Sequence, residues 1–181
     1  MTLCAVLVAS VCSVSFGQSL EQYSHGSVAA KVGWAGAFDT AVLGPTILSD
    51  KETMISGSAE IRPFRYIGFE FDASGMSRQE HSMTGQVTSQ GSVVFLNGNV
   101  VVHPPIGNRV RPYIFGGAGD MVLKEQIGPT AGTHYGRVFT VGGGVDTRLK
   151  HRLYLRTEAR SFSPRIYNKV LQFSAGLAFH W

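Results

Sequence analysis

LQFSAGLAFHW, residues 171–181, alternates apolar side chains with small or polar ones. One face of the corresponding strand would carry Leu171, Phe173, Ala175, Leu177, Phe179 and Trp181. The other face would carry Gln172, Ser174, Gly176, Ala178 and His180. Because successive side chains of a strand point to opposite sides, this period of two predicts a β-strand with one continuous apolar face.

The same alternation recurs upstream. In the stretch 153–160, Leu153 and Leu155 alternate with Arg156, Glu158 and Arg160, so three charges share the face opposite the leucines. The alternating stretches together predict eight strands, at 28–38, 55–61, 67–74, 92–103, 113–124, 139–148, 153–160 and 171–181. Most are about ten residues long, which is what a tilted strand needs to cross a bilayer.

The connections between these strands alternate in length. Short links are expected at 62–66, 104–111 and 150–152, and longer polar links at 39–53, 75–91, 125–136 and 162–169. A membrane barrel has this asymmetry, with short turns on the periplasmic side and longer loops outside. The alternative is a soluble eight-stranded barrel of the lipocalin type, in which nothing requires loop lengths to segregate.

Composition favours the membrane interpretation. Charged residues make up 15% of the 181-residue chain and hydrophobic residues 44%, whereas soluble domains average about 25% charged residues. After residue 20 there is no run of about 18 apolar residues that would predict a membrane helix. Since backbone polar groups in lipid must all be paired, apolar-faced strands there have to close on themselves. We therefore predict an all-β fold, an eight-stranded antiparallel up-and-down transmembrane β-barrel.

The N-terminus is typical of a targeting segment. Residues 2–16 are mostly apolar or small, and Ser15 and Gly17 supply small residues where a signal peptidase cleaves. We predict a signal peptide over 1–17 and a single outer-membrane β-barrel domain over 18–181. Both cysteines, Cys4 and Cys12, lie within the signal peptide, so the mature chain is expected to lack disulfides and cysteine-based metal sites.

An eight-stranded barrel has an interior that side chains fill. The charged faces of the predicted strands would point into it, which gives as lumen candidates Glu60, Glu70, Asp72, Asp120, Lys124, Asp146, Arg156, Glu158 and Arg160. A buried charge is costly unless it is paired. We therefore expect an ionic network in which Arg156 and Arg160 bridge to acids on neighbouring strands.

Four stretches, at 111–119, 141–146, 155–160 and 173–181, resemble the small OmpA/OmpX-type outer-membrane β-barrel proteins. The resemblance implies a bacterial outer-membrane location, contact with outer-membrane lipid and assembly by the barrel-assembly machinery. In that family a terminal aromatic residue preceded by alternate apolar residues resembles the signal that this machinery reads. By position, the signal would comprise Phe173, Ala175, Leu177, Phe179 and Trp181.

The sequence offers little for catalysis or cofactor binding. The glycines in 115–120 and 142–144 fit curved strands better than a dinucleotide or phosphate loop. We expect the histidines to lie at the surface or near strand ends and not to bind metal, since none pairs with another at ligand spacing; they are His25, His81, His103, His134, His151 and His180. We therefore expect no cofactor.

Net charge is +4 with a pI near 9.3, but no run of three basic residues indicates nucleic-acid binding. The main hypothesis is a non-enzymatic barrel with a structural or surface-interaction role through its extracellular loops, whose ligand the sequence leaves open. The alternatives are a lipid-modifying envelope enzyme, for which Glu80, His81 and Ser82 form the only tight cluster of suitable residues, and a narrow solute channel.

Overall fold

The computed structural model describes residues 25–37, 52–81, 87–105, 109–127, 130–164 and 169–181, with side chains described except at 37, 78–81, 87–90, 125–127 and 130. The predicted signal peptide at 1–17 lies outside these residues. Within the described ranges, no helix is long and apolar enough to cross a membrane.

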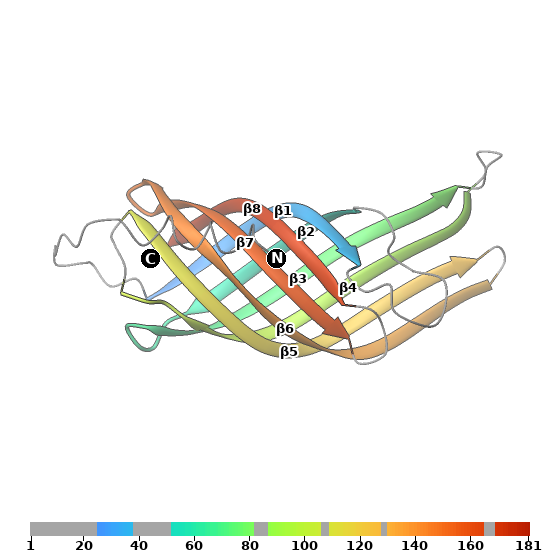
Figure 1. Cartoon of the computed structure of the whole chain (residues 1–181), viewed down its shortest axis with the longest axis horizontal. Helices are drawn as coiled ribbons and strands as arrows, with labels where there is room; N and C mark the ends of the chain where they lie inside the picture. Colours follow the sequence, from blue (N-terminus) through green and yellow to red (C-terminus); the bar gives the residue numbers. More distant parts are fainter. Residues whose placement is uncertain (1–24, 38–51, 82–86, 106–108, 128–129, 165–168) are drawn as a thin grey trace, which may run out of the picture.

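The described residues form eight antiparallel strands that close into a barrel in chain order (Figure 1). The strands are β1 Gly26–Ala37, β2 Glu52–Ile61, β3 Ile67–His81, β4 Val87–Val102, β5 Val110–Ile127, β6 Thr130–Lys150, β7 Leu153–Pro164 and β8 Val170–His180. Each strand pairs with the next, and β8 pairs with β1 from Ser27↔His180 to Ala37↔Val170. The predicted up-and-down barrel is confirmed.

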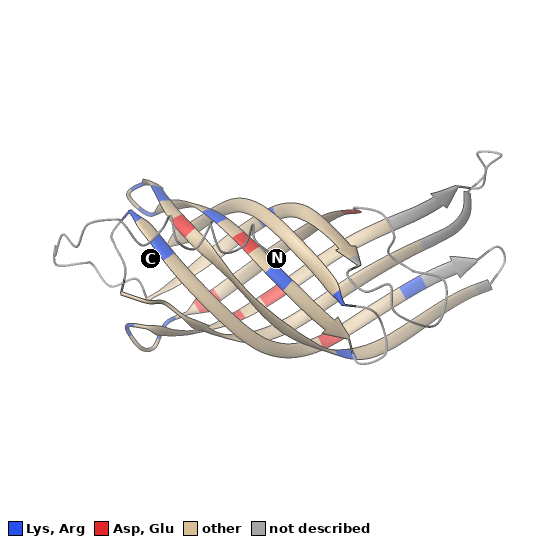
Figure 2. Cartoon of the chain, in the orientation of Figure 1, with Lys and Arg blue, Asp and Glu red and all other residues tan. Residues whose placement is uncertain are grey.

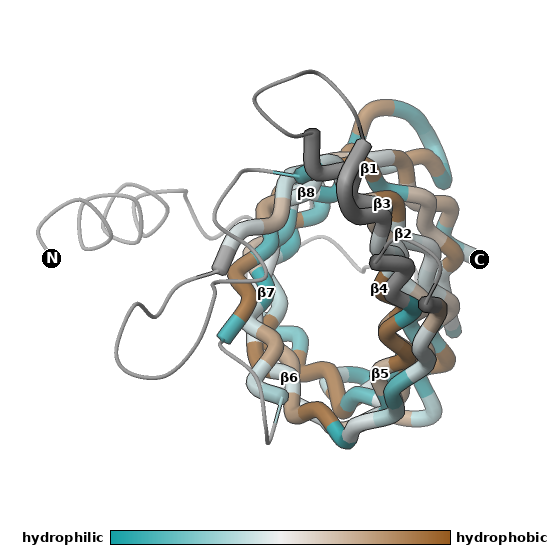
Figure 3. Tube along the Cα trace, turned by 90° about the vertical axis from the view of Figure 1, so that its right-hand side faces the viewer, coloured by the Kyte–Doolittle hydropathy of each residue, from teal (hydrophilic) through white to brown (hydrophobic). Residues whose placement is uncertain are grey.

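The two ends of the barrel differ. One end, which we call the turn end, holds residues 62–66, 103–105, 109 and 151–152 together with His25 and Trp181. There His25 donates a backbone hydrogen bond to Trp181 (2.7 Å) and His180 donates one to Arg152 (2.9 Å). The opposite end, where β1, β3, β5 and β7 finish, is the loop end. Seen along the axis, the strands surround the interior completely (Figure 3).

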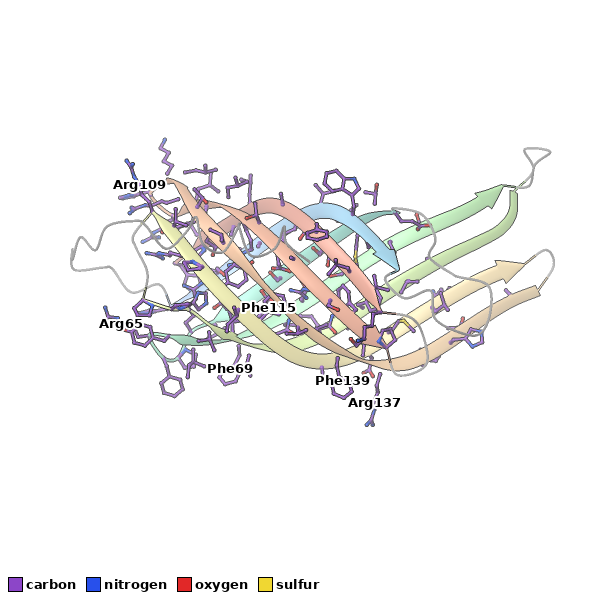
Figure 4. All side chains as sticks on the ribbon, in the orientation of Figure 1. Arg65, Phe69, Arg109, Phe115, Arg137 and Phe139 are labelled. Atoms are coloured by element: carbon purple, nitrogen blue, oxygen red, sulfur yellow. The ribbon has the colours of Figure 1, made fainter. Side chains whose placement is uncertain are left out.

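The outer wall is apolar. In β8, Phe173 and Leu177 are 53% and 52% exposed, whereas the alternate residues Gln172 and His180 are buried inside. The same outward orientation holds for Phe69 in β3 and Phe139 in β6, which project from the wall in Figure 4. A contiguous apolar surface of this kind is unfavourable in water and fits a hydrocarbon surrounding.

Strand β5 differs from the sequence prediction. Asp120 and Lys124, predicted in the lumen, are exposed on the outside, whereas Tyr113, Phe115, Met121 and Leu123 are buried. Asp120 pairs with Arg137 in β6, just beyond the point where β6 begins to pair with β7 at Val138↔Pro164. Both outward charges therefore lie at or past the loop-end rim of the barrel, where water can solvate them. The interior at that level is filled by large apolar side chains instead.

Two of the predicted long loops are mostly strand. Residues 75–81 and 87–91 lengthen β3 and β4, and residues 125–127 and 130–136 lengthen β5 and β6, so that these strands extend well beyond the rest of the barrel (Figure 1). The pairing of β2 with β3 ends at Met54↔Met76, while β4 and β5 stay paired out to Ser89↔Ile127. We call the outer sheet the four-stranded extension formed by 77–81, 87–92, 124–127 and 130–137. Its sequence lacks an apolar alternation, which is why it resembled loops.

A first prediction follows from the outward orientation of the apolar side chains on the barrel wall. Val141 is 62% exposed on the outer face of β6, with Phe139 and Gly143 as its neighbours on that face. Val141→Arg is expected to destabilise the barrel in lipid vesicles by about 2 kcal/mol, because the guanidinium would enter the hydrocarbon. Urea titration of the refolded protein measures this loss. Tyr135→Arg, on the same face but in the outer sheet, serves as the control, and equal losses for the two variants would contradict the orientation.

Candidate functional site

The interior of the barrel contains a charged layer; Figure 2 marks the positions of Lys, Arg, Asp and Glu along the strands. Among the described residues, five carboxylates and four Lys or Arg side chains are buried there, namely Glu60, Glu70, Asp72, Asp146 and Glu158 with Lys31, Arg62, Arg156 and Arg160. They come from β1, β2, β3, β6 and β7 and from the β2–β3 turn. The inward faces of these five strands thus supply charge that can be neutralised only inside the barrel.

Arg156 in β7 forms a bidentate ion pair. Its Nε and Nη2 donate to the two oxygens of Asp146 on the neighbouring strand β6, at 2.7 and 2.8 Å. Its guanidinium also lies 4.9 Å from the centre of the Tyr113 ring and 3.5 Å from Glu70 across the interior. Such a bidentate pair fixes the geometry of both side chains, so Arg156 joins β3, β5, β6 and β7.

Arg160, two inward-facing positions further along β7, reaches across the lumen. It pairs with Asp72 at 2.6 Å, with Glu70 at 3.0 Å and with Glu158 of its own strand at 2.9 Å. Lys31 in β1 completes this cluster through Glu158 at 3.0 Å and Asp72 at 3.3 Å. The cluster therefore crosses the barrel from β7 to β3 and β1.

A second group lies toward the turn end. Glu60 accepts from Arg62 at 2.7 Å and faces His103 at 2.6 Å. His180 Nε2 lies 3.0 Å from Asp146. These contacts connect the β2–β3 turn and the ends of β2, β4 and β8 to the charged layer.

Toward the loop end, the interior is apolar. We call this region the apolar plug, and its members are Ala35, Met54, Met76, Val93, Phe95, Met121, Leu123, Val138, Phe162 and Val170. Phe95 and Phe162 stack across it with ring centres 4.3 Å apart. All of its members are less than 9% exposed. The lumen is thus filled by side chains at two successive levels, one ionic and one apolar.

The structure brings together the lumen residues that the sequence analysis named, with the exception of Asp120 and Lys124. Glu60, Glu70, Asp72, Asp146, Arg156, Glu158 and Arg160 are all buried and each has an ion-pair partner. Arg156 bridges to a neighbouring strand, whereas the acids that Arg160 meets on another strand lie across the lumen. A structural role for this network stays a prediction.

Other members of the network were missed. Lys31 alternates with Val28, Ala30, Val32 and Trp34, so the pattern of its own strand placed it on the inner face. Arg62 looked like part of a solvated turn. His103 and His180 were expected near the surface or at strand ends, and the structure buries them at 8% and 3% exposure. Because both histidines lie close to turns, the sequence did not indicate that the barrel interior extends as far as these residues.

The structure tests two further predictions only in part. Phe173, Ala175, Leu177, Phe179 and Trp181 all point outward from the last strand and its end, but their recognition by the assembly machinery stays a prediction. The side chains of Glu80, His81 and Ser82 lie outside those that the structure describes. Among the described side chains, no group of three or more His, Cys, Asp or Glu residues is arranged to hold a metal ion.

The model of the outer membrane protein β-barrel domain family matches residues 4–179 of the chain. The chain belongs to this family. Its location is therefore the bacterial outer membrane, with the apolar wall in contact with lipid. By the usual topology of such barrels, the turn end faces the periplasm and the loop end faces outside. No curated protein matches the chain.

Several solved outer-membrane barrels are similar. Neisserial surface protein A (NspA) matches with a TM-score of 0.69 at 15% identity, covering 89% of this chain and 100% of NspA. OprG from Pseudomonas aeruginosa matches with 0.63 at 12% identity, covering 90% and 99%. Ail, the attachment invasion locus protein of Yersinia pestis, matches with 0.61 at 12% identity, covering 87% and 99%. At these identities the likeness extends to the fold alone.

Proposed function

We propose that the barrel is a non-enzymatic, non-conducting anchor that presents the outer sheet for contacts with other molecules outside the cell. The filled lumen is the observation that carries this proposal. An ion would have to pass both the charged layer and the apolar plug, whose members Phe95, Phe162 and Met54 are at most 1% exposed. Displacing a packed core and a satisfied ionic network is too costly for a passive pore.

The outer sheet supplies the surface for the proposed role. Beyond the barrel rim, residues 130–137 of β6 pair with β5 but, among the described residues, with no second strand. An edge strand of this kind is suited to receive an extended segment of another protein. Tyr135 is 76% exposed in it, next to the exposed side chains of His134 and Arg137. A surface role also agrees with the name of Ail, the attachment invasion locus protein.

The test compares intact cells that express the full chain with cells that express a shortened form. In the shortened form, Asn-Gly replaces residues 77–92 and 124–133, which joins the register partners Met76 with Val93 and Leu123 with His134. We expect adherence to cultured epithelial cells and to heparin-coated surfaces to fall to the level of non-expressing cells. Heat-modifiable gel mobility should persist, since the barrel keeps its strands.

Two further readouts bear on the same proposal. In planar bilayers, the full-length barrel should show no unitary conductance, with a general porin as the positive control. Lipid A extracted from expressing cells should be unchanged. Adherence that survives shortening would refute the surface role, and discrete channel openings would refute the closed lumen.

A further inference from the structure

The exposed charge of the barrel is unevenly distributed between its ends. At the turn end, five exposed basic side chains form what we call the basic rim: Arg65, Arg109, Arg148, Lys150 and Arg152. Arg111 lies beside them, but it is half-buried and is the register partner of Asp146, so it is not counted in the rim. The acids at this level among the described residues, Glu60 and Asp146, are turned into the lumen and 1% exposed. Among the described residues, the exposed Asp, Glu, Lys and Arg side chains of the turn end are thus all basic.

The rim is a continuous surface over much of its length. Arg148 donates a backbone hydrogen bond to Arg109 at 2.8 Å, which fastens the β4–β5 link to β6. The guanidinium of Arg111 lies 5.2 Å from the centre of the Tyr154 ring, and Tyr154 is the register partner of Arg148. Lys150 and Arg152 follow directly at the β6–β7 turn. Figure 4 shows Arg65 and Arg109 at this end of the molecule.

Apolar side chains lie directly beside these cations. Phe64 is 62% exposed, Leu149 is 55% exposed and Trp181 is 45% exposed. Arg65 lies 5.3 Å from the centre of the ring of its neighbour Tyr66. Aromatic residues flanking an apolar wall mark the interface between hydrocarbon and headgroups. The basic rim is therefore at the depth of the headgroups of lipids whose chains cover the wall.

We propose that the basic rim binds the phosphodiester headgroups of anionic phospholipids in the periplasmic leaflet. Basic side chains at a membrane surface attract anionic lipid electrostatically, and guanidinium groups also donate paired hydrogen bonds to phosphate. The adjoining exposed Phe64, Leu149 and Trp181 favour a lipid over a soluble anion, because they would contact acyl chains while the cations contact phosphate. The rim would gather phosphatidylglycerol or cardiolipin around the turn end. These contacts would fix the depth of the barrel in the membrane.

The chain contains its own probes for a test. Its only two tryptophans, Trp34 and Trp181, lie near the loop end and at the turn end, and both are exposed on the outer wall. In a Trp34→Phe barrel reconstituted in phosphatidylcholine vesicles, quenching of Trp181 by brominated phosphatidylglycerol is compared with quenching by brominated phosphatidylcholine. We expect phosphatidylglycerol to be preferred at least about fivefold, the contribution of one nearby cation. The preference should shrink in 1 M salt, where screening is strong.

Matched variants assign the preference to the rim. The triple change Arg148→Gln, Lys150→Gln and Arg152→Gln should abolish it. The loop-end triple Lys124→Gln, Arg137→Gln and Lys169→Gln removes three cations that are also exposed and should leave the preference unchanged. Urea titration of both triples verifies that the barrel remains folded.

Two results would overturn the proposal. One is equal quenching of Trp181 by the two brominated lipids. The other is a preference that the loop-end triple, and not the rim triple, removes. Sedimentation with purified cell-wall sacculi adds a third arm: binding to sacculi that the rim triple abolishes, without any lipid preference, would assign the rim to the cell wall instead.

Discussion

Arg156→Met is expected to destabilise the barrel in lipid vesicles by about 3–5 kcal/mol, because it removes the cation from three buried carboxylates. Arg156 donates twice to Asp146 and lies within 3.5 Å of Glu70 and 3.7 Å of Glu60. Without it, Asp146 keeps its contact with His180 at 3.0 Å but loses its bidentate partner. Urea titration monitored by tryptophan fluorescence measures the change in unfolding free energy.

Two further variants separate the ion pair from loss of side-chain volume. Arg137→Met removes an exposed arginine outside the charged layer and should change stability by less than about 0.5 kcal/mol. The double variant Arg156→Met with Asp146→Leu removes both partners, and should recover a large part of the loss because an apolar pair leaves less uncompensated charge. If Arg156→Met were as mild as Arg137→Met, the charged layer would contribute nothing measurable to stability.

The charged layer shows which features of the site the sequence predicts and which it does not. Period-two alternation placed Arg156, Glu158 and Arg160 on the inner face of one strand, because the opposite face carried Leu153 and Leu155. The same reasoning applied to 28–38 would have found Lys31. What alternation cannot supply is the partner of each charge. Arg160 meets Asp72 across the lumen, and that contact depends on barrel closure and register, which no local pattern encodes.

Strand β5 shows where the pattern misleads. Both of its faces contain apolar residues, since Tyr113 and Phe115 point in while Ile114 points out at 60% exposure. Because apolar residues occur on both faces, the face that carries Asp120 and Lys124 was predicted to be the inner one on the basis of their charges. That prediction was wrong. In the interior, Phe115 packs 4.5 Å from the guanidinium of Arg160, a cation–π contact that makes an aromatic residue suitable for a charged lumen. The extent of the outer sheet was equally hidden, because strands with water on both faces need no apolar alternation.

The seam between β1 and β8 depends on close backbone approach at glycine. A Cβ atom on Gly176 in β8 would collide with the carbonyl oxygen of Ala30 and lie 2.6 Å from the Cα atom of Lys31, both in β1. Gly33 in β1 has the reciprocal relation to β8, where a Cβ would meet the carbonyl of Phe173 and lie 2.6 Å from the Cα atom of Ser174. Backbone atoms cannot move aside as a flexible side chain can, so a methyl group at either position would force the two strands apart.

Gly176→Ala is therefore expected to destabilise the barrel by about 3 kcal/mol, at the upper end of the cost of overpacking. Gly98→Ala in β4 is the matched control, because a Cβ there has no atom within 4 Å. Both changes reduce the entropy of the unfolded chain equally, which favours folding by about 0.4–1 kcal/mol, so the difference between the variants isolates the collision. Urea titration in vesicles should show Gly98→Ala unchanged or slightly stabilised and Gly176→Ala clearly weakened. Equal stability of the two would mean that β1 and β8 close with more space than the structure gives them.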